Sequence, residues 1–252
     1  SILITTVWVL EGEWNKKVFE YTKDLADGVN VHHYPQHAGE ENDAGLLSAP
    51  QTLDQIIPGV RKQLKEFGVP GKKYQIWLTE WNSVDFKPGP QTLGIVNALF
   101  VADYLGMLTK HNIEQASYWD IHNDMTEQGG DYGYLSRTGA PDGDNVPRPS
   151  YWAFKLTSET LRGKLVQTAS ADDNITAYLV VNNGKQSLLL VNKYPKTKAT
   201  LSLAIPGFKG KGSIKVLSAE NAKSGYTSQP VEIKDGGSIT LPAYSVTAVT
   251  LE

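Results

Sequence analysis

The residues best suited to chemistry in this sequence follow the ends of apolar, strand-like segments. Glu80 comes directly after the apolar run of "YQIWLTEWNS" (74–83), His32 and Tyr34 end a second such segment, and Trp119 ends a third. The carboxyl ends of parallel strands meet at one rim, where such folds bind ligands. Taken singly, Glu80 could equally be a loop residue or a helix cap. The coincidence of polar and aromatic groups at three strand ends favours a ligand site instead.

The other reactive patterns in the sequence do not predict a site. The histidines of "HHYPQH" (32–37) have the spacing of a zinc-binding helix, but Pro35 blocks a helix there. The chain has no Cys, which excludes disulfides, Cys-ligated zinc, thiol catalysis and iron–sulfur clusters. No Gly-Xaa-Ser-Xaa-Gly element is present. We therefore expect neither a metal nor a cofactor.

Composition and charge limit the classes of partner. The 252 residues are 40% hydrophobic and carry a net charge of -3, which gives no basic field for nucleic acid or an anionic membrane. No apolar run reaches the length of a membrane span. The chain begins with Ser, so we expect a processed form or a piece of a longer precursor. The sequence leaves its location open; of the compartments, we favour a secreted or bacterial periplasmic one.

The first two-thirds of the chain alternate between strand-like and helix-like segments, which predicts a parallel sheet covered by helices. The predicted strands are 2–10, 28–34, 74–80 and 114–122, and the predicted helices are 13–26, 48–68, 92–112 and 147–163. In the first helix Trp14, Val18, Tyr21 and Leu25 form an apolar stripe, which we expect to be buried. Residues 35–49 and 123–148 are predicted loops.

After about residue 164 the helix-like segments end and the pattern of the sequence becomes β-prone throughout. Short β-prone runs such as "ITAYLVVN" (175–182) and "SLLLVNK" (187–193) follow one another, separated by turn signals such as "NNGK". This spacing predicts an antiparallel β-sandwich. We place a domain boundary between residues 1–163 and residues 164–252.

Three segments resemble those of clan A retaining glycoside hydrolases, and most closely the family 39 β-xylosidases and the family 51 α-L-arabinofuranosidases. "LTEWN" (78–82) resembles the nucleophile segment that ends their seventh barrel strand. "VHHYP" (31–35) resembles the sixth-strand segment with His-x-Tyr, and "YWDIHND" (118–124) resembles the eighth-strand segment that carries a substrate-facing Trp. The later "GDYGYLS" and "VPRPSYWAFKL" resemble the run into the final barrel helix, after which many of these enzymes carry a β-sandwich. The resemblance covers nearly the whole chain in order.

The resemblance implies an α/β plus all-β fold: half of a TIM-type (β/α)8 barrel, made of four βα units, followed by an antiparallel β-sandwich. It makes Glu80 the nucleophile of a glycosidase that cleaves plant or microbial polysaccharide by double displacement. His32, Tyr34, Trp81 and Trp119 would bind substrate, with Tyr34 donating its hydroxyl to Glu80. Trp81 could be a wall of the subsite or could pack under the rim.

The sequence departs from the family at the second catalytic group. Clan A enzymes carry the acid/base as Asn-Glu at the end of the fourth strand, and this chain has no Asn-Glu dipeptide. Glu11, Glu13, Glu40 and Glu41 do not match that pattern, so the acid/base is not identifiable. An alternative function is therefore a catalytically silent carbohydrate-binding protein.

Four parallel strands cannot close into a barrel, so the two outer strands would keep open edges that recruit other strands. We expect the partner to be the N-terminal half-barrel of the same precursor or a second copy of the chain, in addition to an oligo- or polysaccharide. No nucleic-acid or membrane partner is expected.

Overall fold

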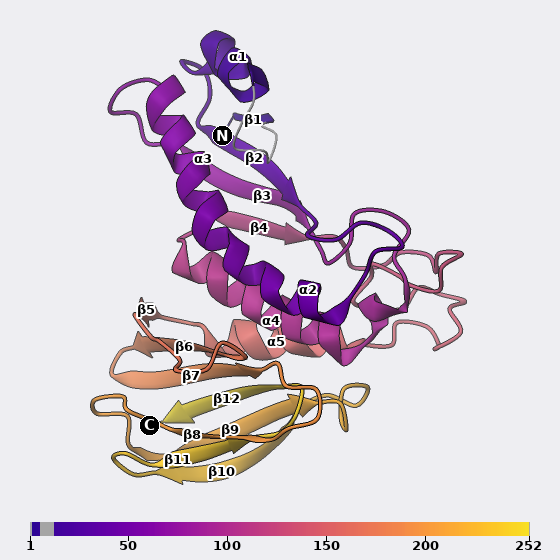
Figure 1. The fold of residues 1–252 in the computed structure, drawn as a ribbon, viewed down its shortest axis with the longest axis vertical. Coiled ribbons are helices and arrows are strands. Elements are labelled where there is room, and N and C mark those ends of the chain that lie inside the picture. The colour runs from indigo at the N-terminus through magenta and orange to yellow at the C-terminus, as the bar shows by residue number, and fades with distance from the viewer. Residues whose placement is uncertain (1, 6–12, 252) are drawn as a thin grey trace.

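The computed structural model describes residues 2–5 and 13–251, and the first part of the chain forms a four-stranded parallel sheet (Figure 1). Its strands lie side by side in sequence order: β1 (Leu3–Thr5), β2 (Gly28–His33), β3 (Gln75–Trp81) and β4 (Gln115–Tyr118). The strand predicted at 2–10 is seen as β1; its residues 6–10, and Glu11 after them, lie outside the described residues. The parallel order confirms the predicted half-barrel.

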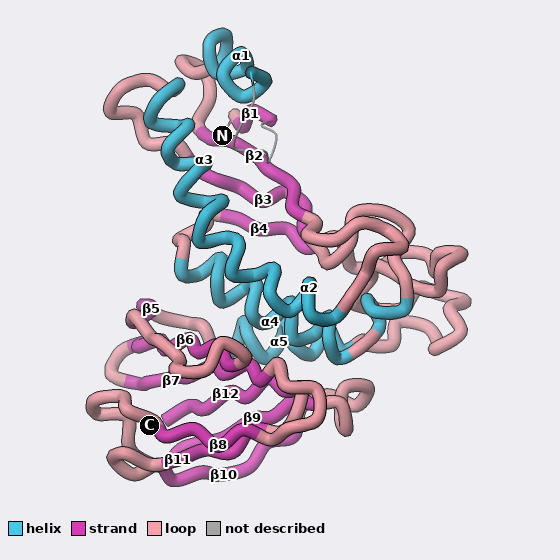
Figure 2. Tube along the Cα trace, viewed as in Figure 1, coloured by secondary structure: helices cyan, strands magenta, loops and turns pink. Residues whose placement is uncertain are grey.

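Helices alternate with these strands (Figure 2). They are α1 (Glu13–Thr22), α2 (Asp43–Ser48), α3 (Leu53–Phe67), α4 (Ile95–Lys110) and α5 (Pro149–Thr160), with short 3-10 segments η1 (Ala49–Thr52) and η2 (Pro90–Leu93). Val31 and Leu78 point to one face of the sheet and are fully packed in the core, whereas Asn30, His32 and Trp77 point to the other face and stay at least partly exposed. We call this second face the open face; it corresponds to the interior of a closed barrel.

The loop predicted at 35–49 in fact contains helix α2. Its N-cap is Asn42, whose side-chain oxygen accepts a hydrogen bond from the Gly45 amide at 2.7 Å. Ser48, the first residue of the helix predicted at 48–68, is instead the last residue of α2 and donates its hydroxyl to the Gly45 carbonyl. The helical segment therefore begins earlier than predicted, because an Asn cap upstream was not recognised.

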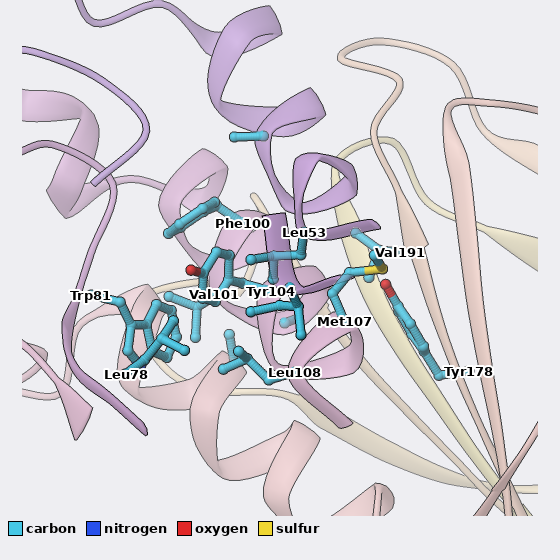
Figure 3. Close-up of a cluster of buried hydrophobic side chains, with 14 of the residues drawn as sticks. Leu53, Leu78, Trp81, Phe100, Val101, Tyr104, Met107, Leu108, Tyr178 and Val191 are labelled. Atoms are coloured by element: carbon cyan, nitrogen blue, oxygen red, sulfur yellow. The ribbon is translucent and has the colours of Figure 1, made fainter. Parts of the chain in front are cut away.

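Helix α4 is buried along most of its length and mainly apolar, because two of its sides are covered (Figure 3). One side packs on the sheet, where Trp81 and Tyr104 stack with ring centroids 4.6 Å apart. The other side packs on the sandwich, where Met107 lies near Tyr178 and Val191. Within the described residues, neither α4 nor any other helix is both long and apolar enough to cross a membrane.

Helix α1 buries a different face from the predicted one. Its buried residues are Asn15 and Phe19. Trp14, Tyr21 and Leu25, which we expected in the core, are 57%, 84% and 70% exposed. The periodicity predicted the helix correctly, but not which of its faces meets the rest of the chain. Of the predicted stripe, Val18 is partly buried against the core, whereas Trp14, Tyr21 and, just after the helix, Leu25 face outward.

The C-terminal part is an antiparallel β-sandwich, as predicted. Its strands are β5 (Lys164–Val166), β6 (Ile175–Asn182), β7 (Lys185–Asn192), β8 (Ala199–Ser202), β9 (Gly210–Ser218), β10 (Thr227–Ile233), β11 (Ser238–Leu241) and β12 (Ser245–Leu251). A six-stranded sheet in the order β10-β9-β12-β7-β6-β5 faces a two-stranded sheet of β11 and β8. Leu188, Leu190 and Phe208 are buried in the core between the two sheets.

A buried polar network joins the sandwich to helix α4. Lys193 Nζ lies 2.6 Å from Asp103 Oδ2, and Tyr178 donates its hydroxyl to Asp103 Oδ1 at 2.5 Å. The Tyr178 ring lies against Gly106 so closely that a Cβ there would be 2.3 Å from it. Because a buried charge is costly unless it is paired, this network fixes where the sandwich docks.

Candidate active site

An extra residue in β3 decides where Glu80 points. In the pairing of β3 with β2, Val31 lies opposite Leu78 and His32 lies opposite Glu80, so that Thr79 has no opposite residue. The pairing with β4 shifts between Leu78 and Trp81 as well. Side chains alternate along a regular strand, which would turn Glu80 toward the helices, on the same side as Leu78. The bulge at Thr79 resets the alternation and leaves Glu80 on the open face.

His32 on β2 and Tyr34, which follows the end of β2, approach one oxygen of the Glu80 carboxylate. The Tyr34 hydroxyl donates a hydrogen bond to Glu80 Oε2 at 2.9 Å, and His32 Nδ1 lies 3.4 Å from the same oxygen. His32 Nε2 lies 3.0 Å from Thr79 Oγ1, which fixes the imidazole between the two residues of the bulge. Burial, together with the hydrogen bond and charge of Glu80, raises the pKa of Tyr34 well above its ordinary value. Tyr34 therefore stays a protonated donor, and the predicted Tyr34–Glu80 hydrogen bond is confirmed.

Trp81 does not reach the rim. It is fully buried, stacks on Tyr104 and meets Tyr118 edge to face at 5.1 Å. The bulge that turns Glu80 outward also turns Trp81 toward helix α4. The prediction that Trp81 contacts substrate is therefore wrong, and the alternative that it packs under the rim holds.

Trp119 stands just beyond β4 and is 43% exposed. Its amide donates to the Trp81 carbonyl at 3.0 Å, which extends the pairing of β3 and β4 past the assigned end of the strand. The peptide bond from Trp119 to Asp120 is cis. A partly exposed indole in this place is available to contact a ligand at the strand ends.

Tyr132 and Asn82 border the site and were not foreseen. The rings of Tyr132 and Tyr34 meet edge to face with centroids 6.5 Å apart. Asn82 is fully buried and donates through Nδ2 to the main-chain carbonyls of Trp119 and Tyr132. Tyr132 belongs to the long loop after β4, and no spacing rule relates it to Glu80. The available signal was that both residues lie in segments that resemble the hydrolases, Asn82 in "LTEWN" and Tyr132 in "GDYGYLS".

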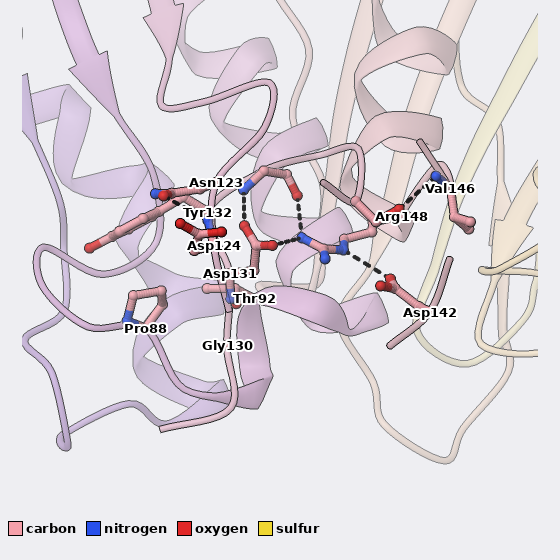
Figure 4. A network of polar contacts seen from close by, with 12 residues as sticks. Pro88, Thr92, Asn123, Asp124, Gly130, Asp131, Tyr132, Asp142, Val146 and Arg148 are labelled. Carbon is pink, nitrogen blue, oxygen red and sulfur yellow. Dashed lines mark hydrogen bonds and ion pairs between the residues drawn. The ribbon is translucent and has the colours of Figure 1, made fainter. Parts of the chain in front are cut away.

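An ion pair inside the long loop holds Tyr132 in place (Figure 4). Arg148 Nη1 lies 2.7 Å from Asp131 Oδ2, and both side chains are almost completely buried. Arg148 also donates to the Gly133 carbonyl at 2.9 Å, and the Asp131 amide donates to Thr92 Oγ1 at 3.1 Å. These contacts fix the backbone on both sides of Tyr132.

Among the carboxylates at the rim, Asp120 has the most clearly altered pKa. Burial, and then the charge of Asp131, raise its pKa to about 6. Its Oδ1 is buried and has no hydrogen-bond partner among the described residues. The charge of Asp120 also contributes to the raised pKa of Tyr34 and of Tyr132. The Asp120 carboxylate is therefore near enough to both phenols for its charge to raise their pKa.

Glu11 lies outside the described residues, and the other carboxylates considered from the sequence lie elsewhere or are otherwise occupied. Glu13 begins helix α1 and is exposed, and Glu40 is exposed in the loop after β2. Glu41 accepts hydrogen bonds from the amides of Gly39 and Gly89, both at 2.8 Å. Within the described residues no group of three or more His, Cys, Asp or Glu is placed to hold a metal ion.

Comparisons with known proteins relate the chain to glycoside hydrolases through its fold. No protein-family model matches the sequence, and no curated protein sequence matches it. Among solved structures, the α-L-arabinofuranosidase from Thermotoga maritima, in its arabinose complex, aligns with a TM-score of 0.78 and 16% identity over 99% of this chain and 57% of that chain. The family 51 α-L-arabinofuranosidase from Thermotoga petrophila RKU-1 gives the same values.

A second family of neighbours supports the same architecture. The family 44 endoglucanase Cel44A from Clostridium thermocellum aligns with a TM-score of 0.70 and 18% identity over 95% of this chain and 51% of that chain. The chain thus spans a little over half the length of these enzymes. At these identities the similarity establishes a shared fold, and it agrees with the resemblance to clan A glycoside hydrolases that the motifs indicated.

We expect Asp120→Asn to stabilise the chain at neutral pH. The pKa of Asp120 is raised from 3.8 to about 6, so the folded chain binds more protons than the unfolded chain between these values. Stability is therefore lost as pH rises through this window. The gain from Asn should be about 1 kcal/mol, below the roughly 3 kcal/mol of two full pKa units, because water screens a partly exposed carboxylate.

Urea unfolding at about pH 4 and about pH 7.5 measures this difference. Asp120→Asn should match the unmodified chain at the lower pH and exceed it at the higher one. The exposed Asp173 provides the control, and Asp173→Asn should show no such difference. Equal stability of the Asp120 variant and the parent at both values would show that burial of Asp120 is not costly.

Proposed function

We propose that this chain is part of a retaining glycoside hydrolase in which Glu80 is the nucleophile. The observation that carries the proposal is the bulge at Thr79. It places Glu80 on the open face, at the carboxyl end of a parallel sheet, within hydrogen-bonding distance of the Tyr34 hydroxyl. The fold shared with glycoside hydrolases supports the same reading. As a substrate we propose a plant or microbial polysaccharide.

The contacts of Glu80 leave one oxygen for the attack. Tyr34 and His32 both approach Oε2, and Oε1 has no hydrogen-bond partner among the described residues. In double displacement Oε1 bonds to the anomeric carbon while the glycosidic C–O bond breaks, and a second carboxylic acid gives its proton to the leaving oxygen. Water then attacks the same carbon, gives its proton to the second carboxylate and releases Glu80. His32, Tyr34 and Trp119 would shape the sugar subsite.

The second carboxylic acid comes, in this proposal, from outside the chain. Retaining enzymes place it about 5–5.5 Å from the nucleophile. Among the described residues, none of Glu13, Glu40 and Glu41 is hydrogen-bonded to Glu80, Tyr34 or His32, and Asp120 is the rim carboxyl group with a raised pKa. If no acid is supplied, the remaining aromatic rim would make a carbohydrate-binding protein, which is the second candidate function.

The missing half of the barrel would cover the apolar stripe of α1. A full barrel surrounds each helix with a neighbour on both sides, and Trp14, Tyr21 and Leu25 have no such cover. An exposed apolar patch of this kind marks an interaction surface. We propose that the N-terminal half-barrel of the same precursor, or a second copy of the chain, packs there and adds strands beside β1 and β4. Residues 1–163 then form the C-terminal half of the catalytic barrel, and residues 164–252 the sandwich domain.

Activated aryl glycosides test the role of Glu80. A nitrophenolate leaves with little protonation, so the chain should release a burst of about one equivalent even without its acid. Stopped-flow absorbance with 4-nitrophenyl α-L-arabinofuranoside and 4-nitrophenyl β-D-xyloside measures the burst. Glu80→Gln should abolish it, because an amide does not attack.

The matched control is Glu66→Gln, an exposed carboxylate on α3, which should keep the full burst. A burst that survives in Glu80→Gln would contradict the assignment of the nucleophile. No burst from the unmodified chain, together with measurable binding of oligosaccharides, would favour the carbohydrate-binding function.

Light scattering on size-exclusion eluate tests the partner surface. We expect the chain alone to elute above its monomer mass of 27.6 kDa, because the stripe of α1 is uncovered. Tyr21→Lys combined with Leu25→Lys should return it to the monomer. Val166→Lys replaces an exposed apolar residue of the sandwich and should leave the mass unchanged. If the unmodified chain is a monodisperse monomer of 27.6 kDa, the proposal that this surface binds a partner is contradicted.

A further inference from the structure

The buried Asn82 forms hydrogen bonds to several of the segments that border the site. Its amide nitrogen Nδ2 donates to the Trp119 carbonyl and, at 3.3 Å, to the Tyr132 carbonyl. Its Oδ1 accepts from the Ser83 amide at 2.7 Å, and its own backbone amide donates to the His33 carbonyl at 3.3 Å. One residue thus connects the end of β3 to β2, to the end of β4 and to the long loop.

The two carbonyls belong to the aromatic residues that border Glu80. Trp119 is the half-exposed indole at the end of β4. The Tyr132 ring meets the Tyr34 ring, and Tyr34 in turn donates to Glu80. Asn82 follows Glu80 by two positions, directly after the end of β3. The hydrogen bonds of this side chain therefore link the backbone of both rings to the segment that carries Glu80, in addition to the contacts that Arg148 and the Trp119 amide make.

The groups around residue 82, two carbonyls and one backbone amide, are matched best by an amide side chain. Asn offers two N–H donors on one nitrogen and an acceptor beside them. Asp of the same shape has no donor and would turn an oxygen toward two carbonyls, and Ser has one donor only. Carbonyl oxygens left buried without a donor are costly, so the loop would move to find other partners.

We infer that Asn82 is a positioning residue of the proposed site, which sets the places of Trp119 and Tyr132 relative to Glu80. The inference rests on the proposed function for its consequence, the binding of a sugar. Its structural content, the placement of the two rings, is independent of that function.

The sandwich provides a matched control for a merely structural role. Asn192 is also fully buried, its Nδ2 donates to the carbonyls of Thr197 at 3.2 Å and Pro242 at 2.6 Å, and its Oδ1 accepts from the Tyr194 amide at 3.0 Å. The two asparagines therefore share burial and hydrogen-bond pattern. They differ in which carbonyls they hold, and those held by Asn192 belong to the sandwich domain.

The experiment compares Asn82→Asp with Asn192→Asp in chain labelled with 5-fluorotryptophan. Trp119→Phe identifies the Trp119 signal among the six tryptophans in the fluorine NMR spectrum. Urea unfolding should show that both variants lose stability. The Trp119 signal should shift or broaden in Asn82→Asp alone. Asn82→Ser, which keeps one donor, should give a smaller change and serves if Asn82→Asp does not fold.

The burst with 4-nitrophenyl α-L-arabinofuranoside and 4-nitrophenyl β-D-xyloside supplies the functional readout. Asn82→Asp should raise the substrate concentration for half-maximal burst about tenfold, equivalent to about 1.4 kcal/mol, and keep the amplitude because Glu80 is intact. Asn192→Asp should change neither quantity.

The outcomes separate the inference from the proposed function. A Trp119 signal unchanged in both Asn82 variants would overturn the inference, whether or not the chain shows a burst. A signal that moves equally in Asn192→Asp would overturn it too, by showing a general loss of packing. A signal that moves in the Asn82 variants alone, with no burst from the unmodified chain, would support the positioning role and reject the hydrolase.

Discussion

The bulge at Thr79 is the constraint on which the rest of this site depends. Without it, Glu80 would follow Leu78 into the packed face of the sheet, and Trp81 would stand on the open face in its place. One added residue exchanges the two side chains. The indole gains aromatic packing, although its buried Nε1 has no hydrogen-bond partner among the described residues, and the carboxylate gains a tyrosine donor and partial exposure. A carboxylate in the core would instead lose its hydration without a partner.

The remainder of the chain keeps this rim in one arrangement. Helix α4 is held between the sheet and the sandwich, so Trp81 packs against a helix that is itself fixed on its far side. The Asp103–Lys193 pair fixes the position of the sandwich along α4, because apolar contacts alone would allow the two to shift against each other. On the other side of the rim, the Arg148–Asp131 pair fixes the loop that presents Tyr132. The sandwich thus supports the site indirectly, through α4.

The sequence predicted the architecture well because periodicity reports which residues share a face. It foresaw the four parallel strands, the sandwich and the Tyr34–Glu80 contact. It misplaced the buried face of α1, since periodicity finds an apolar stripe and does not say what the stripe meets. It did not decide whether Trp81 forms a wall of the sugar subsite or packs in the core. That choice depends on the bulge, which is visible only in the pairing with neighbouring strands. Tyr132 and its loop depend on contacts between residues distant in sequence, which no local pattern encodes.

The central claim is that Glu80 attacks the anomeric carbon from the open face. Covalent trapping tests it most directly: the chain is incubated with activated 2-deoxy-2-fluoro glycosides of xylose and arabinose, digested, and its peptides are analysed by mass spectrometry. We expect a fluoroglycosyl adduct on Glu80, in the peptide that carries Thr79 and Trp81. An adduct on another carboxylate, with Glu80 unmodified, would contradict it.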